Sequence, residues 1–233
     1  MDGMQEALHN LILDLMLLAN GGTGNLGVPS NQNRTGGGGS PEKSGAWTAK
    51  NEWSDAEIEK YSEYYKKRCK EAVENGEKYD CMDFQMRVLF EYAMENSLPL
   101  ILKTMSGKSI SYKDYSSPEA FWKALSSELS ALNLDLLANT EMVSYQQRMS
   151  GDMKLLEFGS SMHVVGYFMD YYKGVYKPLS YGNITNDGKT APVRFHVNEW
   201  TRSYPNLVGY ENGERIYGSN NYVLRWNFQH TMR

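Results

Sequence analysis

The order of two sequence patterns constrains the fold of this 233-residue chain more than any other feature. From Ser54 to about residue 140, apolar residues recur at the three- and four-residue spacing of helices. Beyond that point, short segments rich in Val, Ile, Tyr, Phe and Trp alternate with Gly and Asn, which is typical of strands. Helices followed by strands predict an α+β fold, with the helices packed on one face of an antiparallel sheet.

Three helices are predicted, and local capping signals mark where they begin. Ser54 and Glu57 form a capping box, in which each side chain satisfies a free amide of the first turn. Ser117 is a hydroxyl cap directly before Pro118, and proline is favoured at the first position of a helix. The predicted helices run from Ser54 to Gly76, from Asp80 to Asn96, and from Ser117 through Leu132. The second is apolar over a wide face, so we expect it to be the central buried helix.

Five strands are predicted from the same alternation of apolar segments and turn residues. They are Met153–Phe158, His163–Tyr171, Pro192–Trp200, Glu214–Gly218 and Tyr222–Phe228. The segment from Gly182 to Thr190 is predicted to form the end of a hairpin.

A glycine-rich segment divides the chain before the first capped helix. Residues 20–46 contain few branched apolar side chains and cannot bury enough surface to offset backbone entropy, so we predict a flexible linker. Residues 1–19 are predicted to form a short amphipathic helix, and the alternatives are docking on the main domain, simple disorder, and docking on a partner. The main domain is predicted to span residues 47–233.

The N-terminal segment is predicted to be neither a membrane span nor a cleavable export signal. The apolar run from Ala7 to Ala19 is shorter than the roughly 20 residues that cross a bilayer. Acidic Asp2 and Glu6 precede it, whereas a secretory signal has Lys or Arg there. If the protein leaves its cell, we expect secretion without a cleavable signal peptide.

Composition and motif spacing exclude several other functions. The formal charge of -4 argues against a nucleic-acid partner, which needs a basic face, and two cysteines are too few for a disulfide scaffold. No His-Glu-x-x-His or Cys-x-x-Cys motif occurs, and the nearest cluster, around His196 and Asn198, offers at most two metal ligands. The glycine-rich segment also lacks the Lys of a phosphate-binding loop. We therefore predict no metal and no cofactor.

Cys81 is the candidate nucleophile because of its place at the start of a predicted helix. With Asp80 as the N-cap, Cys81 lies in the first turn, where the partial positive charge of the helix favours the thiolate. Together with a cationic histidine beside it, this position predicts a depressed thiol pKa and alkylation well below pH 7. The other cysteine, Cys69, lies mid-helix on an apolar stripe, and we assign it to core packing. The alternative for Cys81 is the same packing role.

His163 is the candidate base among four histidines. His9 lies on the tethered helix and His230 lies three residues from the C-terminus, so neither is expected to be held firmly. His163 is predicted to open an apolar strand, where a helix N-terminus can face the imidazole. A satisfied residue at a strand edge is the alternative, and the pairing with Cys81 decides for catalysis.

Three short motifs occur in an order that resembles the NlpC-type and CHAP-type papain-like hydrolases. They are Asp80-Cys81 opening a helix, Gly151-Asp152-Met153 leading into a strand, and His163-Val-Val-Gly-Tyr opening the next strand. The longer sequence Asp-Cys-Met-Asp-Phe, Leu-Phe-Glu-Tyr-Ala and Asn-Ser-Leu-Pro also looks like a subgroup carried by contact-dependent and type VI secretion toxins. The resemblance covers residues 79 to about 228 and implies a papain-like (NlpC-type) fold.

The resemblance also implies a third polar residue that hydrogen bonds the far nitrogen of the catalytic imidazole. In these families it lies on a later strand, often in an Asn-containing stretch that resembles Gly-Ser-Asn-Asn-Tyr here. This implies Asn220, with Asn221 as the next choice. His196 and Asn198, on one face of their predicted strand, are rivals. Ser-Asn-Asn is also ordinary turn sequence, so a simple hairpin turn stays open.

The implied activity is cleavage of amide bonds in bacterial peptidoglycan by a secreted antibacterial effector. Such a protein acts in the periplasm of a target bacterium and has a cognate immunity protein as its partner. The chain departs from the families after Cys81, where Met-Asp-Phe replaces small residues, so the substrate groove near the thiol need not be the usual one. The alternatives are a protease, deamidase or acyltransferase acting on another target, and a catalytically inert binding module.

Overall fold

The computed structural model describes ten segments of the chain. They are residues 45–135, 138–158, 161–169, 171–172, 175–176, 179–181, 190–196, 207–211, 214–217 and 222–228. The chain divides into the units Met1–Glu42 and Lys43–Arg233, and all described residues belong to the second. The predicted helix at 1–19 and the linker up to residue 44 lie outside the described residues. Ala46, the last residue assigned to the linker, is buried and its N–H donates to the Tyr112 carbonyl oxygen at 2.7 Å, so packing begins before residue 47.

The described α-helices begin where their caps predict. They are α2 (Asp55–Glu74), α3 (Cys81–Glu95) and α4 (Pro118–Glu128). The Ser54 hydroxyl accepts from the Glu57 N–H at 3.3 Å, and the Asp80 carboxylate accepts from the Met82 N–H at 2.9 Å. Ser117 caps α4 in the same way. Because each cap acts within three residues, the helix starts could be predicted locally.

Helix α4 ends earlier than predicted. Its C-cap is Leu129, and Leu132 belongs to the separate short helix η2 (Ala131–Asp135). Leu129 is buried, whereas Leu132, the last residue of the predicted apolar face, is half-buried. The predicted face is therefore confirmed at Leu129, and the predicted helix length is wrong.

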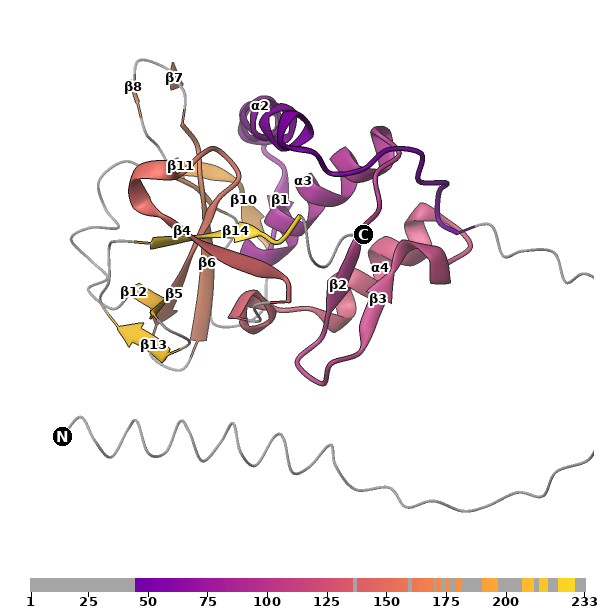
Figure 1. The fold of residues 1–233 in the computed structure, drawn as a ribbon. Helices are drawn as coiled ribbons and strands as arrows, with labels where there is room; N and C mark the ends of the chain where they lie inside the picture. Colours follow the sequence, from indigo (N-terminus) through magenta and orange to yellow (C-terminus); the bar gives the residue numbers. More distant parts are fainter. Residues whose placement is uncertain are drawn as a thin grey trace, which may run out of the picture. The chain divides into compact units, whose positions relative to one another are not determined.

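The strands confirm an α+β protein with antiparallel pairing. An eight-stranded sheet contains β4 (Thr140–Ser144), β5 (Met153–Phe158), β6 (Ser161–Tyr167), β9 (Leu179–Tyr181), β11 (Arg194–His196), β12 (Leu207–Glu211), β13 (Glu214–Tyr217) and β14 (Tyr222–Trp226). Its main order is β11-β9-β6-β5-β12-β13, and β14 pairs with both β4 and β5 (Figure 1). The described pairings in this sheet are antiparallel.

Three smaller pairs of strands complete the described sheets. They are β1 (Lys78–Tyr79) with β10 (Ala191–Pro192), β2 (Ile101–Lys103) with β3 (Ser109–Ser111), and β7 (Tyr171–Tyr172) with β8 (Val175–Tyr176). Two single-turn helices, η1 (Tyr112–Asp114) and η3 (Tyr145–Gln147), lie between the larger elements.

The predicted strands were correct in part. The bounds of Met153–Phe158 are confirmed, whereas the predicted strand His163–Tyr171 is wrong at both ends, because β6 is Ser161–Tyr167 and Tyr171 belongs to β7. The predicted hairpin end lies largely outside the described residues, but its flanking strands β9 and β11 pair antiparallel. The pair β2–β3 was missed because three-residue strands are too short to show an alternating pattern.

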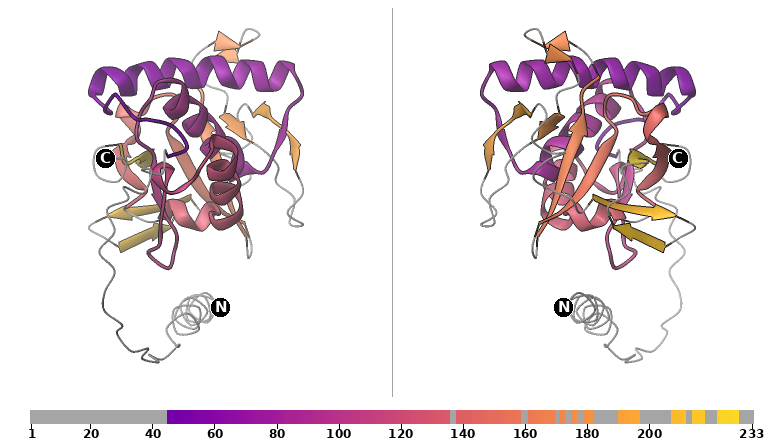
Figure 2. Two further views of the ribbon diagram at one scale, coloured as in Figure 1. Left: turned by 90° about the vertical axis from the view of Figure 1, so that its right-hand side faces the viewer. Right: turned by 90° about the vertical axis from the view of Figure 1, so that its left-hand side faces the viewer.

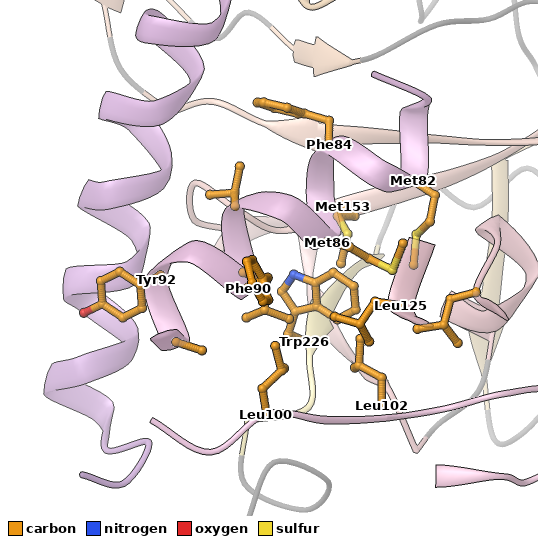
Figure 3. Packing of buried hydrophobic residues seen from close by; sticks show 14 of the residues in the cluster. Met82, Phe84, Met86, Phe90, Tyr92, Leu100, Leu102, Leu125, Met153 and Trp226 are labelled. Atoms are coloured by element: carbon orange, nitrogen blue, oxygen red, sulfur yellow. The ribbon is translucent and has the colours of Figure 1, made fainter. Parts of the chain in front are cut away.

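Helix α3 packs against the sheet and against the two other helices, and α2 also contacts the sheet directly at β11. Helix α3 contacts β6 on one side and both α2 and α4 on others, and Figure 1 and Figure 2 show the helices gathered on one side of β5 and β6. In the core, Met86 and Phe90 of α3 lie around Trp226 of β14 together with Leu100 and Leu125 (Figure 3). None of the helices in the described part of the chain combines the length and apolarity that a bilayer crossing requires.

Alternation along β6 assigns its side chains to two faces of the sheet. Val164 belongs to the core cluster beneath the helices, and a side chain at Gly166 would meet Gln85 of α3. Because successive residues of a strand point to opposite faces, His163, Val165 and Tyr167 lie on the other face. This division decides what surrounds the candidate base.

Candidate functional site

Cys81 is the first residue of α3, and a strand positions it. The preceding residues Lys78 and Tyr79 pair with β10, and Asp80 is extended (φ -69, ψ 158) before the helix begins. This junction places the thiol in the first turn, as predicted. The Cys81 residue is 3% exposed and is not in a disulfide.

The start of α3 meets β6 at the residues that carry the candidate base. The Val164 N–H donates to the Cys81 sulfur, and His163 is the preceding residue of the strand. In the described residues, strand β9 pairs with β6 at Gly166 and Tyr167 only. The edge of β6 at Val164 is therefore not paired with β9 and can contact the start of α3. His163 does not open the strand as predicted, since β6 begins at Ser161, but the structure brings the Cys81 sulfur to its neighbouring amide.

Asp80 influences both members of the candidate pair. Burial and the Asp80 charge, together with a hydrogen bond to the Asp80 carboxylate, raise the pKa of the Cys81 thiol to about 12. The predicted depressed thiol pKa is therefore wrong. The prediction counted the helix terminus and a cationic His163, whereas the capping carboxylate opposes the helix terminus and burial favours the neutral form of both groups. The sequence had identified Asp80 only as a cap.

His163 is neutral in this setting. Burial lowers the pKa of the imidazole, and the smaller effect of the Asp80 charge raises it. Asp80 therefore acts on His163 as well as on Cys81. At neutral pH these shifts favour a thiol at Cys81 and an imidazole at His163, and not a thiolate and an imidazolium.

A second carboxyl group shares the first turn of α3. Burial, and then the Asp80 charge, raise the pKa of Asp83 to about 6. The Asp80 charge thus acts on three titratable groups of this region, which are Cys81, Asp83 and His163.

The Gly-Asp motif before β5 has a structural role. The Asp152 carboxylate is buried and accepts from Arg225 at 2.8 Å through both oxygens, and one oxygen also accepts from the Met149 N–H at 2.8 Å. Gly151 has φ +94, and a Cβ there would lie 2.8 Å from the Tyr61 ring. These contacts explain the motif without catalysis, because they tie the start of β5 to β14 and α2.

Gln85 and Gly166 fix how closely α3 approaches β6. Gln85 lies one turn after Cys81, is fully buried, and accepts from the Tyr65 hydroxyl at 2.7 Å. A Cβ at Gly166 would lie 2.6 Å from the Gln85 Oε1 atom. Only glycine allows this approach, which sets the position of the thiol above it. A glycine inside an apolar strand was the available signal, and the sequence analysis did not use it.

The other predicted site residues are placed as follows. Asn220, Asn221 and Asn198 lie outside the described residues. His196 ends β11, and its side chain is not among those described. Cys69 is buried in the middle of α2, where the sequence predicted it. Within the described segments, no three His, Cys, Asp or Glu side chains gather where they could hold a metal ion.

Comparisons with protein-family models, with curated proteins and with solved structures find no match to this chain.

Proposed function

We propose that the chain is a cysteine-dependent amidase or endopeptidase with a papain-like fold, which uses Cys81 as nucleophile and His163 as general base. The observation that carries the proposal is the contact between the first turn of α3 and β6, where the Cys81 sulfur accepts from the amide next to His163. Amide hydrolysis by a cysteine needs a base within hydrogen-bond reach of the thiol, and the proposal assigns that place to the His163 imidazole.

The proposed reaction begins from the neutral pair. As the Cys81 sulfur attacks an amide carbonyl, His163 takes the thiol proton. The Cys81 backbone N–H stabilises the oxyanion at the positive end of α3, together with a second donor. The imidazolium then protonates the leaving amine, and water hydrolyses the thioester to return the thiol.

Asp80 is proposed to stabilise the imidazolium during this sequence. Its charge favours the protonated form of His163, which exists only after the thiol proton has moved. Because the same charge disfavours a free thiolate, Asp80 suppresses reactivity at rest and supports it once a base is engaged. Asn220 stays the proposed residue for the far nitrogen of the imidazole.

The proposed substrate is bacterial peptidoglycan, and the proposed role is that of a secreted antibacterial effector with an immunity protein as partner. The order of the cysteine, Gly-Asp and histidine motifs, with its resemblance to NlpC-type and CHAP-type hydrolases, supports this substrate. Its site of action would then be the periplasm of a target bacterium. A protease, deamidase or acyltransferase would use the same cysteine and histidine on another substrate.

The burial of Cys81 favours a second candidate, a catalytically inert binding module. A thiol with a pKa of about 12 and 3% exposure is a poor nucleophile unless a base acts on it. The two candidates differ in one property that can be measured directly, which is turnover.

The deciding experiment digests purified sacculi with the full chain and identifies the released fragments by mass. We expect new amide-cleavage products from the wild type, none from Cys81→Ala, and products again from Cys69→Ala, the matched buried cysteine. Cleavage that survives Cys81→Ala would exclude the proposed mechanism. Absence of products from folded wild-type protein would exclude peptidoglycan, and a peptide-library screen would then separate another amide substrate from an inert module.

A further inference from the structure

Two cationic side chains share a pair of tyrosine rings beside β5 and β6. The rings of Tyr145 and Tyr167 meet edge to face, with centroids 6.0 Å apart. The Arg148 guanidinium carbon lies 3.7 Å from the Tyr145 centroid, and the Lys154 Nζ lies 5.0 Å from the same centroid. Both cations also lie 5.7 Å from the Tyr167 centroid. The cluster thus places two positive charges against one aromatic wall.

Arg148 leaves hydrogen-bonding capacity unused in this cluster. Its Nη1 donates to the Tyr145 carbonyl oxygen, whereas its buried Nε has no hydrogen-bond partner. A buried charged donor without an acceptor costs free energy that a ligand oxygen can recover. The guanidinium is therefore prepared for an acceptor that the described part of the chain does not supply.

Two other arginines show that the described fold supplies carboxylates elsewhere. Arg225 donates to both oxygens of Asp152 at 2.8 Å. Arg87 lies 5.2 Å from the Phe90 centroid, which resembles the placement of Arg148, but its Nε donates to Glu91 at 2.6 Å. Packing on an aromatic ring does not by itself leave a guanidinium without a carboxylate, so the state of Arg148 is specific to its cluster.

The neighbouring cation adds to the attraction for an anion. Burial, and then the Arg148 charge, lower the pKa of Lys154 to about 8. Each positive group disfavours the charge on the other. An anion bound here would reverse this effect and raise the pKa of Lys154 again.

The cluster lies on the same face of the sheet as His163. In β6, His163 and Tyr167 point to one face because four residues separate them, which places them about 13 Å apart at about 3.3 Å per residue. Lys154 of β5 pairs with Val165, the residue midway between them, and so points to the same face. The cluster and the imidazole thus share one face of the sheet, and Val165 between them is buried.

We propose that Arg148 and Lys154, between Tyr145 and Tyr167, form a binding site for an anionic oxygen group, a carboxylate or a phosphate. Its use as a substrate subsite rests on the proposed function, because only then does His163 act on the ligand. Binding of the anion itself does not depend on catalysis.

The test titrates the full chain with sodium acetate and, separately, with inorganic phosphate, and follows the ¹⁵Nε–¹Hε resonance of Arg148. We expect a saturable shift with at least one anion, and the anion that binds more tightly identifies the source. Arg148→Gln should weaken that binding at least about tenfold, as expected for the loss of a charge-assisted hydrogen bond, when it is followed through the Lys154 ammonium resonance. Arg87→Gln, the matched arginine on an aromatic ring, should leave the affinity unchanged.

Several outcomes would overturn the proposal. They are the absence of a saturable shift in the wild type with either anion, and an affinity that Arg148→Gln leaves unchanged. If Arg148→Gln does not fold, the wild-type titration is repeated with Lys154→Gln, which should also weaken anion binding. Anion binding does not require turnover. If the chain binds the anion but cleaves no substrate, the proposed hydrolase activity is refuted and the anion site still stands.

Discussion

Helices α2 and α3 each begin with a side-chain cap and each bury a cysteine, but the two thiols lie at different places along their helices. Cys69 lies in the middle of α2, fully buried within the core cluster. Cys81 opens α3, with Asp80 before it and the Val164 amide against its sulfur. Burial is nearly equal, so position along the helix, and not exposure, separates the two thiols.

The two caps differ in charge, which decides how the helix terminus acts on its first turn. Ser54 caps α2 with a neutral hydroxyl, whereas Asp80 caps α3 with a carboxylate. A helix N-terminus favours negative charge close to it, and at α3 the carboxylate already occupies that place. The thiol of Cys81 therefore stays protonated until a base removes its proton.

The largest expected effect compares the two cysteines in the hydrolase reaction. Cys81→Ala should reduce the rate of sacculus cleavage by at least about 10³-fold, because it removes the nucleophile. Cys69→Ala should keep the rate within about threefold. Initial rates of fragment release measure both, with circular dichroism as the check on folding. Equal losses in two folded variants would show that the thiol of Cys81 has no special role.

The next effect concerns the base that acts on Cys81. His163→Ala should lower the same rate by about 10²- to 10⁴-fold, the usual contribution of a general base. His196→Ala, a rival from the sequence, should retain most of the activity. The opposite ranking of the two histidines would move the base to β11 and separate the chemistry from the contact between α3 and β6.

The sequence predicted the local features of this comparison and missed the features that depend on distant contacts. The caps at Ser54 and Asp80 act within three residues, so the helix starts and the place of Cys81 could be predicted. The partner of Asp152 is 73 residues away, which no local pattern indicates. The predicted pKa of the Cys81 thiol was wrong for the same reason. The burial of this thiol depends on β6, which is remote from Cys81 in the chain.

Pairing within the sheet was also beyond local patterns. The bounds of β5 were correct, but nothing in its residues indicates that it pairs with β6, β12 and β14. The sequence placed His163 at a strand end, and the structure places it inside β6, which begins at Ser161.

The third expected effect tests the charge at the start of α3. Wild-type Cys81 should be alkylated more slowly than free cysteine at pH 8, with a rate that still rises with pH above 9, because its raised pKa keeps the thiol protonated. Asp80→Asn retains a capping side chain but removes the charge that favours the thiol. The pKa of the Cys81 thiol should then fall, and the thiolate fraction at pH 8 should rise about tenfold for each unit of that fall.

Alkylation of Cys69 serves as the internal control for the Asp80 variant. Its rate should not respond to Asp80→Asn, and mass mapping of the labelled peptides separates the two cysteines. A faster reaction at both sites would indicate general loosening of the core. A profile for Cys81 that is unchanged by Asp80→Asn would mean that burial alone holds the thiol in its neutral form.

The smallest expected effect isolates capping from chemistry. Ser54→Ala removes the hydroxyl that accepts from the Glu57 N–H, so the free energy of unfolding should fall by about 1 kcal/mol, as measured in urea. The alkylation profile of Cys81 should stay in place, because the start of α2 carries no charge that acts on the thiol. Asp80→Ala should cost a similar free energy, but it should also shift that profile to lower pH. If both variants changed the profile equally, the reactivity of Cys81 would follow stability, and the charge of Asp80 would have no separate effect.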